Sequence, residues 1–472
     1  MKIAVVGTGY VGLVSGACFA ESGHEIACVD KDASKIAGLK RGVVPIFEPG
    51  LTDLILANAA AGRLSFTTDL KQALAGTELA FIAVGTPPRL SDGEADLSFV
   101  FSAAKEIALG ASSDLIVVVK STVPVGTCDA VRRVFARERP ELDVTVVSNP
   151  EFLREGSAIK DFQCPDRIVI GAQDARALQA MRRLYARQEA AGVPLQFTAN
   201  RTAELIKYAA NAFLALKVSF INEMADVCEQ ADSDIAEVSI GMGLDHRIGQ
   251  AFLNAGPGFG GSCFPKDTMA LLRTSQEYGV PMRLVQETIF INDSRKRRMA
   301  QKVIDAFDGD INGKTVAVLG LTFKPDTDDM RESPAIPLIE TLQKAGAIIR
   351  AYDPVALEKA RAIFNDVEMF ADPYECVCQA DAMVMVTDWS VIKKLDLKII
   401  AQSMRTRVLV DLRNGFDRER VSEAGFTHIQ IGRPPAIAAD QGNNIHKVTS
   451  ATVARGSAPV ELAKSRRRGD QA

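Results

Sequence analysis

Directly after Met1 the chain reads Lys2-Ile3-Ala4-Val5-Val6-Gly7-Thr8-Gly9-Tyr10-Val11-Gly12, a short apolar run followed at once by glycines spaced G-x-G-x-x-G. The run predicts a buried parallel strand, and the glycines permit a tight turn into a helix whose first N–H groups can bind a pyrophosphate. Asp30 ends the next apolar run, about 20 residues on, where a carboxylate can bind both ribose hydroxyls and repel a 2′-phosphate. The pattern predicts an NAD site, with a glycine turn that binds nothing as the alternative.

Alternating strand and helix patterns continue from this opening. Helical stretches such as Val11–Ser22 and Phe99–Leu109 separate the apolar runs. The runs that we expect to be buried parallel strands are Ile3–Val6, Ile26–Val29, Leu79–Val84, Leu115–Val119 and Val144–Val147. This alternation predicts a doubly wound α/β domain, which we place at residues 1–198.

The pattern changes after residue 198. Thr202 to Asp226 contains no glycine or proline, so we expect one long helix from Asn200 to about Gln230, within a central helical and dimerisation domain at residues 199–300. A second Rossmann-like unit at residues 312–435 has expected strands at Val316–Leu319, Ile348–Tyr352, Met383–Val386 and Val408–Val410. Residues 436–472 are polar and small, which predicts a disordered tail. The fold class is α/β, with two doubly wound domains joined by a long helix.

Bulk composition excludes several classes of protein. The 472 residues are 47% hydrophobic and 24% charged with a net charge of −4, so nothing points to nucleic acid. Eight cysteines without a C-x-x-C pair, and four histidines without metal-ligand spacing, predict reduced thiols and no metal site. There is no signal peptide and no apolar run long enough to span a bilayer, so we expect a cytoplasmic protein without a membrane partner.

Cys263 is the strongest candidate for chemistry. Gly260-Gly261-Ser262-Cys263-Phe264-Pro265-Lys266-Asp267 presents one thiol at an expected helix start, with Asp267 one turn further on. Because a helix N-terminus stabilises a thiolate, we expect a lowered pKa. A buried structural cysteine is the commoner fate of a single cysteine, but the glycine loop favours function. A hydride acceptor with an activated thiol predicts a dehydrogenase that proceeds through a thioester to a carboxylic acid.

Two further pairs have i, i+4 spacing. Glu151 and Glu155 follow a strand end, and on a helical turn they would face one cleft, although a solvated acidic helix start is equally open. Lys207 and Asn211 lie on the long helix and could stabilise an oxyanion. The alternative for Lys207 is that its amine extends to solvent.

Two loops follow the carboxyl ends of expected strands. They are Gly85-Thr86-Pro87 and Ser121-Thr122-Val123-Pro124. Ligands bind at these ends in open α/β sheets, although ordinary turns have the same composition.

Several blocks, in collinear order over about residues 1–433, resemble the UDP-glucose/GDP-mannose dehydrogenase family. Beside the glycine fingerprint and the cysteine block, they are Ser121–Thr127, Asn149–Gly156, Lys207-x-x-x-Asn211 and Phe323–Ser333. The stretch Ala255-Gly256-Pro257 lies where relatives vary.

The resemblance implies oxidation of a nucleotide-sugar C6 hydroxyl to a carboxylate, with two NAD consumed. It implies that Lys207 and Asn211 assist the first oxidation and that Cys263 forms a thiohemiacetal and then a thioester. It further implies that Thr122, Glu151 and Asp267 hold the hydrolytic water and that Glu155 borders the nicotinamide. The form of the cysteine block implies UDP-glucose, with GDP-mannose or a UDP-N-acetylhexosamine as the alternative. A non-catalytic binding protein and a two-electron dehydrogenase remain as other classes.

The same resemblance implies the ligand contacts. Those for NAD are Gly7, Gly9, Tyr10, Val11, Gly12, Asp30, Lys35, Thr86, Pro87, Ser121, Thr122, Glu155 and Arg331. Those for the UDP-sugar are Glu151, Phe152, Leu153, Arg154, Glu155, Lys207, Asn211, Arg247, Phe252, Leu253, Asn254, Gly256, Phe259, Gly260, Cys263, Phe323, Lys324 and Arg413. Arg247 would reach the substrate of a neighbouring subunit, so we expect a homodimer or a larger homo-oligomer.

Overall fold

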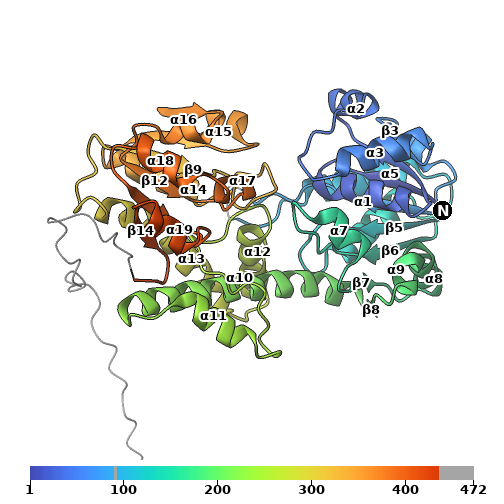
Figure 1. Ribbon diagram of the computed structural model, residues 1–472. Coiled ribbons are helices and arrows are strands. Elements are labelled where there is room, and N and C mark those ends of the chain that lie inside the picture. Colours follow the sequence, from blue (N-terminus) through green and yellow to red (C-terminus); the bar gives the residue numbers. More distant parts are fainter. Residues whose placement is uncertain (90–92, 435–472) are drawn as a thin grey trace, which may run out of the picture.

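The computed structural model describes residues 1–89 and 93–434 (Figure 1). The predicted tail at 436–472 lies outside the described residues. Two α/β units, one at each end of the described chain, are joined by the long helix α10 (Asn200–Gln230), which runs beneath both in Figure 1.

The first sheet has the strand order β3-β2-β1-β4-β5-β6-β7-β8. Its strands are β1 (Lys2–Val6), β2 (Glu25–Val29), β3 (Leu64–Thr67), β4 (Leu79–Ile82), β5 (Leu115–Val119), β6 (Val144–Ser148), β7 (Ile168–Gly171) and β8 (Leu195–Thr198). The pairings are parallel except that β6 meets β7 antiparallel through Ser148 and Gly171. The strand order reverses between β1 and β4, and ligands bind at such a switch point in open α/β sheets.

Helices cover both faces of this sheet because β1 is apolar on both sides. Ile3 and Val5 pack in one core cluster with α1, whereas Ala4 and Val6 pack in a second cluster with α5 and α6. The helices of this unit are α1 (Tyr10–Glu21), α2 (Ala33–Lys40), α3 (Leu51–Ala60), α4 (Leu70–Leu74), α5 (Ser98–Gly110), α6 (Thr127–Glu138), α7 (Ala158–Gln163), α8 (Ala175–Leu184) and α9 (Ala186–Ala190).

Helix α10 is 31 residues long and contacts both units. At its start, the Asn200 side chain accepts a hydrogen bond from Ser148 N (3.0 Å) and donates one to Val146 O (2.9 Å) on β6. Near its end, Glu229 accepts a hydrogen bond from Gly432 N (2.7 Å) in the second unit. The helices that follow are α11 (Ile235–Gly243), α12 (Phe264–Glu277) and α13 (Arg283–Asp305).

The second sheet is parallel throughout, in the order β11-β10-β9-β12-β13-β14. Its strands are β9 (Thr315–Leu319), β10 (Ile348–Tyr352), β11 (Val367–Phe370), β12 (Ala382–Met385), β13 (Val408–Asp411) and β14 (Thr427–Gln430). Its helices are α14 (Ala335–Lys344), α15 (Leu357–Ile363), α16 (Pro373–Val377), α17 (Ser390–Lys393), α18 (Leu397–Ser403) and α19 (Arg418–Glu423). Over residues 1–89 and 93–434, we find no helix with the length and apolar character needed to cross a membrane.

Candidate active site

A cavity of about 1420 Å³ lies at the carboxyl end of the first sheet and is also lined by the second unit. The start of α1 lines it, as do the loops after β4, β5 and β6, the start of α12 and a loop of the second unit. Of the eight cysteines, Cys263 is the one that lines this cavity. Segments far apart in the sequence therefore meet in one space.

The glycine fingerprint forms a cradle that side chains would block. A Cβ on Gly12 would lie 1.9 Å from Gly7 O, and Gly7 itself has φ +107°. A Cβ on Gly9 would meet no atom within 4 Å, and Gly9 lines the cavity beside Tyr10 and Val11. The cradle leaves the N-terminus of α1 open to an anion, so these residues fit the pyrophosphate of NAD.

Asp30 is held as a carboxylate behind this cradle. Its Oδ2 accepts hydrogen bonds from Thr8 N (3.0 Å) and Thr8 Oγ1 (2.6 Å), and Lys35 Nζ lies 3.2 Å away. Burial opposes ionisation, but these hydrogen bonds and one from Asp32 N outweigh it and lower the pKa of Asp30 to about 2. A carboxylate fixed at the end of β2 can accept hydrogen bonds from the hydroxyls of a ribose.

Lys207 does not extend to solvent. It is 3% exposed, and its Nζ forms an ion pair with Glu151 Oε1 at 3.1 Å. Nζ also lies 5.1 Å from the centroid of the Phe152 ring. Burial alone would lower the pKa of Lys207, but Glu151, together with Cys263 and Asp267, raises it, so the amine is a cation.

A second polar cluster joins α10 to α12. Asn211 Nδ2 donates to Asp267 Oδ2 at 2.6 Å, and Lys266 Nζ donates to Asp267 Oδ1 at 2.7 Å. Lys266 also lies 3.4 Å from Thr86 Oγ1 in the loop after β4. Sequence reasoning missed Lys266, although its place beside Asp267 in the cysteine block was a usable signal.

Cys263 lies directly before the first residue of α12, and its carbonyl accepts the hydrogen bond from Asp267 N at 2.8 Å. The predicted lowering of its pKa is wrong. Burial raises the pKa of Cys263 to about 11, although the nearby Lys207 cation works in the opposite direction. Burial, with the charges of Glu151 and Asp267, therefore outweighs the Lys207 cation and the Ser262 hydrogen bond, and the thiol is protonated at neutral pH.

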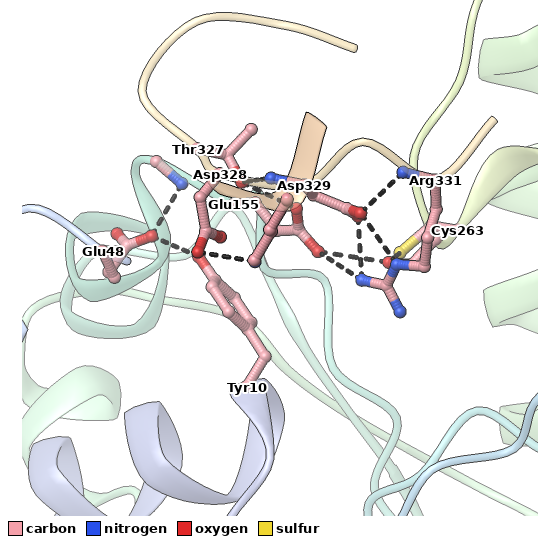
Figure 2. Close-up of polar contacts among 11 residues, drawn as sticks. Tyr10, Glu48, Glu155, Cys263, Thr327, Asp328, Asp329 and Arg331 are labelled. Atoms are coloured by element: carbon pink, nitrogen blue, oxygen red, sulfur yellow. Dashed lines mark hydrogen bonds and ion pairs between the residues drawn. The ribbon is translucent and has the colours of Figure 1, made fainter. Parts of the chain in front are cut away.

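The expected helical pairing of Glu151 and Glu155 is also wrong, because both lie in a loop and α7 begins only at Ala158. The loop nevertheless brings both to the same cavity. Figure 2 shows Glu155 between Thr327 and Arg331: Thr327 Oγ1 donates to it at 3.1 Å, and Arg331 lies 3.6 Å away. Ser262 Oγ donates to its other oxygen at 3.1 Å. Burial and the nearby Asp329 raise the pKa of Glu155.

Glu48 is a buried residue of this region that sequence reasoning missed. Tyr10 donates its hydroxyl proton to Glu48, as Figure 2 shows. The carboxylate also accepts from Gly156 N (2.6 Å) and Ala158 N (2.8 Å). Glu48 thus ties the start of α1 to the loop that carries Glu155. It lies in an irregular segment without a motif, so the sequence held no signal for it.

The expected sugar contacts on the loop after β6 lie in different surroundings. Phe152 stacks under the Arg167 guanidinium, with Cζ 3.8 Å from the ring centroid. Leu153 lines the cavity. The side chain of Arg154 is 60% exposed and pairs with Asp161 at 2.6 Å.

The segment from Phe252 to Gly261 is fastened to α10 and α13. Gly256 N donates to Asn222 Oδ1 at 2.8 Å, and Phe259 N donates to Asn292 Oδ1 at 2.7 Å. Leu253 is buried, whereas Asn254 is exposed. At its end, a Cβ on Gly260 would lie 2.3 Å from Glu332 O, so this glycine is needed for close contact with the second unit.

The second unit supplies Phe323, Lys324 and Arg413 near this segment. Arg413 donates to Phe323 O and to Val386 O, each at 2.8 Å. Lys324 Nζ lies 5.4 Å from the Phe323 ring centroid, and burial lowers the pKa of Lys324 against the opposing charge of Glu155. None of these three residues lines the cavity itself. Arg247, which is 78% exposed and pairs with Asp245, does not line it either.

Comparisons with known proteins match this arrangement along the chain. Residues 1–189, 201–294 and 317–418 match, in turn, the NAD binding domain, the central domain and the UDP binding domain of one family. The chain is 55% identical over 436 residues to a UDP-glucose 6-dehydrogenase of Rhizobium meliloti (strain 1021), covering 92% of this chain and 100% of that protein.

Two further relatives also match this chain over most of its length. UDP-glucose 6-dehydrogenase TuaD of Bacillus subtilis (strain 168) is 46% identical, covering 92% of this chain and 93% of that protein. A solved UDP-glucose dehydrogenase from Pyrobaculum islandicum is 40% identical with a TM-score of 0.83, covering 91% of this chain and 96% of that one. The chain therefore belongs to the UDP-glucose/GDP-mannose dehydrogenase family.

Proposed function

We propose that this protein oxidises C6 of UDP-glucose to give UDP-glucuronate, in two NAD-dependent steps through a thioester on Cys263. The observation that carries the proposal is the meeting of Cys263, the Glu151–Lys207 pair and the glycine cradle around one site. The similarity to proteins named UDP-glucose 6-dehydrogenase supports the choice of sugar.

Bound NAD would supply the hydride acceptor for each oxidation. The N-terminus of α1 would bind its pyrophosphate, Asp30 and Lys35 would lie at its ribose, and Arg331 lines the same cavity. Thr86, Pro87, Ser121 and Thr122 line the cavity after β4 and β5, where the ring that accepts hydride would lie.

In the first oxidation, the C6 hydroxyl loses its proton to a base while hydride leaves C6, and an aldehyde forms. The Lys207 cation and the Asn211 amide stabilise the oxygen that becomes negatively charged. Both groups are already oriented, since Lys207 is paired with Glu151 and Asn211 donates to Asp267.

In the second oxidation, the sulfur of Cys263 adds to the aldehyde carbon and loses its proton, giving a thiohemiacetal. Loss of hydride from that carbon and of the hydroxyl proton to a base gives a thioester. Because the thiol's pKa lies near 11, addition needs the neighbouring cation to stabilise the sulfur and oxygen anions.

Hydrolysis completes the reaction. Thr122, Glu151 and Asp267 line the cavity beside Cys263, where their oxygens can orient a water toward the thioester carbon. Water adds, the C–S bond breaks, the thiol regains its proton, and the carboxylate product is released. Glu155 would order the site through Ser262, Thr327 and Arg331.

The chain offers a binding surface for the rest of the UDP-sugar. Phe152, Leu153 and Arg154 would lie along the sugar and phosphates, with Phe252 to Gly260 beneath the sugar. Lys324 and Arg413 would hold the nucleotide in the second unit. Residues 1–198 then form the NAD domain, 199–300 the central domain with Lys207, Asn211 and Cys263, and 312–435 the UDP-sugar domain.

The test is a substrate panel with NADH counted per sugar. UDP-glucose should yield about two NADH per molecule, and GDP-mannose and UDP-N-acetylglucosamine far less. A ratio near one with free aldehyde would exclude the thioester, and preference for another sugar would replace the substrate assignment. Cys263→Ser should stop formation of acid, whereas Cys378→Ser, which alters an exposed cysteine, should not.

We also propose a homodimer or larger homo-oligomer. Helix α10 exposes Phe213 (62%), Phe220 (47%) and Val227 (55%) at a spacing of seven residues, which places them on one face. Leu244 on the following segment is 81% exposed, and Arg247 lies exposed nearby in the sequence. An apolar stripe of this kind is typical of a protein interface.

We place the protein in the cytoplasm, where its eight free cysteines would stay reduced.

A further inference from the structure

Lys120 is a buried lysine that none of the steps above uses. It directly follows β5 and is 4% exposed. Its Nζ donates to Asn149 Oδ1 (3.1 Å) and Asn149 O (3.4 Å), and lies 3.5 Å from the Tyr185 hydroxyl oxygen. Within the described residues, these partners are all uncharged: an amide oxygen, a backbone carbonyl and a phenol. A buried ammonium with only neutral acceptors is costly, so its retention needs a reason.

The acceptors of Lys120 belong to a hydrogen-bonded cluster at the ends of β5 and β6. Asn149 Oδ1 also accepts from Tyr185 (2.6 Å), and its Nδ2 donates to Val169 O (2.8 Å). Asn149 N donates to Val119 O at 2.9 Å, which aligns the ends of β5 and β6. Glu151 follows Asn149 by two residues, so this cluster fixes the backbone from which the Glu151 side chain extends.

The charged and titratable groups around Lys120 come from three other segments. Glu151 lies in the loop after β6, Lys207 on α10, and Tyr185 at the end of α8, where burial raises its pKa. Burial lowers the pKa of Lys120 to about 8; Glu151 raises it, and Lys207 lowers it. Lys120 is therefore a cation in acid and neutral solution, and it interacts electrostatically with both members of the pair.

We propose that Lys120 is a positioning residue whose hydrogen bonds to Asn149 hold the Asn149–Glu151 segment facing Lys207. The inference rests on the proposed roles of Glu151 and Lys207. Lys120 acts through Asn149 and Glu151, because its amine donates to Asn149 while its neighbours Ser121 and Thr122 line the cavity.

The first test separates kcat from the KM for NAD in Lys120→Met. Without the hydrogen bonds to Asn149, the segment that carries Glu151 is no longer held opposite Lys207, so kcat should fall roughly tenfold or more. The KM for NAD should stay in place, because Lys120 does not contact the glycine cradle. Lys302→Met removes an amine that pairs with Glu229, so it should change neither constant. An unchanged kcat in Lys120→Met, or an equal loss in Lys302→Met, overturns the proposal.

The second test does not need turnover. In protein labelled with [6-¹³C]lysine, the Lys120 signal is assigned by its loss in Lys120→Met or Lys120→Arg, and its titration midpoint is measured. Glu151→Gln removes the charge that favours the cation, so the midpoint should fall by roughly half a pH unit or more. An identical midpoint overturns the proposal even if Lys120→Met does not fold. Failure of the unsubstituted protein to reduce NAD with any sugar would instead contradict the proposed function.

Discussion

At the scale of single residues, burial decides which groups carry charge in the candidate site. Lys207 is a cation because the charges of Glu151 and Asp267 compensate for its lost hydration. Cys263 stays protonated because the Lys207 cation does not compensate for the hydration that a buried thiolate would lose. The proposed nucleophile therefore depends on the Lys207 cation for activation.

This dependence predicts how Cys263 reacts with iodoacetamide. Because only the thiolate reacts and the pKa is about 11, the alkylation rate should rise about tenfold per pH unit between about pH 7 and 10. Lys207→Met removes the cation that lowers this pKa, so alkylation should be slower at every pH in that range. Mass spectrometry of the Cys263 peptide separates it from the exposed Cys164 and Cys378.

Lys302→Met serves as the control for this prediction, because its amine pairs with Glu229 and not with the site. It should alkylate at the rate of the unsubstituted protein. A rate that reaches a plateau below about pH 9 would show a lowered pKa and contradict the assignment.

At the scale of elements, the start of α12 is positioned by its contact with the second unit. Gly261 has φ +81°, and a Cβ there would lie 2.6 Å from Phe323 Cζ. Its N–H donates to Arg331 O at 2.8 Å. The glycines before Cys263 thus serve close packing between units as well as the turn itself.

Gly261→Ala should therefore lower both stability and kcat. The left-handed backbone costs about 1–2 kcal/mol with a side chain, and the clash with Phe323 adds to that cost and displaces Cys263. Gly279→Ala is the matched control: its φ is +69°, but a Cβ there meets no atom within 4 Å. Thermal midpoints and kcat measured side by side check this, and equal losses in the two variants would refute the role of the contact.

Helix α6 depends on a side chain from α10. Glu204 is 2% exposed and accepts hydrogen bonds from Gly126 N (2.6 Å) and Cys128 N (2.8 Å) at the start of α6. This carboxylate ties the loop carrying Ser121 and Thr122 to the helix carrying Lys207. A cap from a distant element cannot be recognised in the local sequence.

Glu204→Ala should leave two buried N–H groups without acceptors and cost about 2–3 kcal/mol. Glu204→Gln should cost less, because its amide oxygen still accepts a hydrogen bond. Thermal unfolding measures both variants, with Glu223→Ala, an exposed change on the same helix, as the control. If Glu204→Ala unfolds at the same temperature as the control variant, the cap does not stabilise α6.

At the scale of the whole molecule, α10 belongs to both units and still exposes an apolar face. The double substitution Phe213→Glu and Phe220→Glu places charge on that face and should convert an oligomer into monomers. Sedimentation velocity at micromolar concentration checks this, with Ile399→Glu, at a 53% exposed apolar position on α18, as the control. A fully active monomer before any substitution would contradict the proposed assembly.

Much of the fold was predictable because strands buried on both faces are continuous apolar runs. The runs at β1, β2, β4, β5 and β6 were each recognised to within a few residues. The missed strands β3, β7, β8, β11 and β14 have four residues each, and most of them are partly exposed. Short strands of this kind lack a periodic signal and are stabilised by pairing with neighbours.

The sequence by itself determined the fold class, the glycine cradle with Asp30, and the presence of a thiol at a helix start. These features depend on local backbone requirements, such as glycine in a crowded turn, which neighbouring residues encode. Only the tertiary structure decided that Lys207 is buried against Glu151, that Glu155 reaches the cavity from a loop, and that burial raises the pKa of Cys263. Burial and the distance between charges arise from segments far apart in the chain, so no local pattern could carry them.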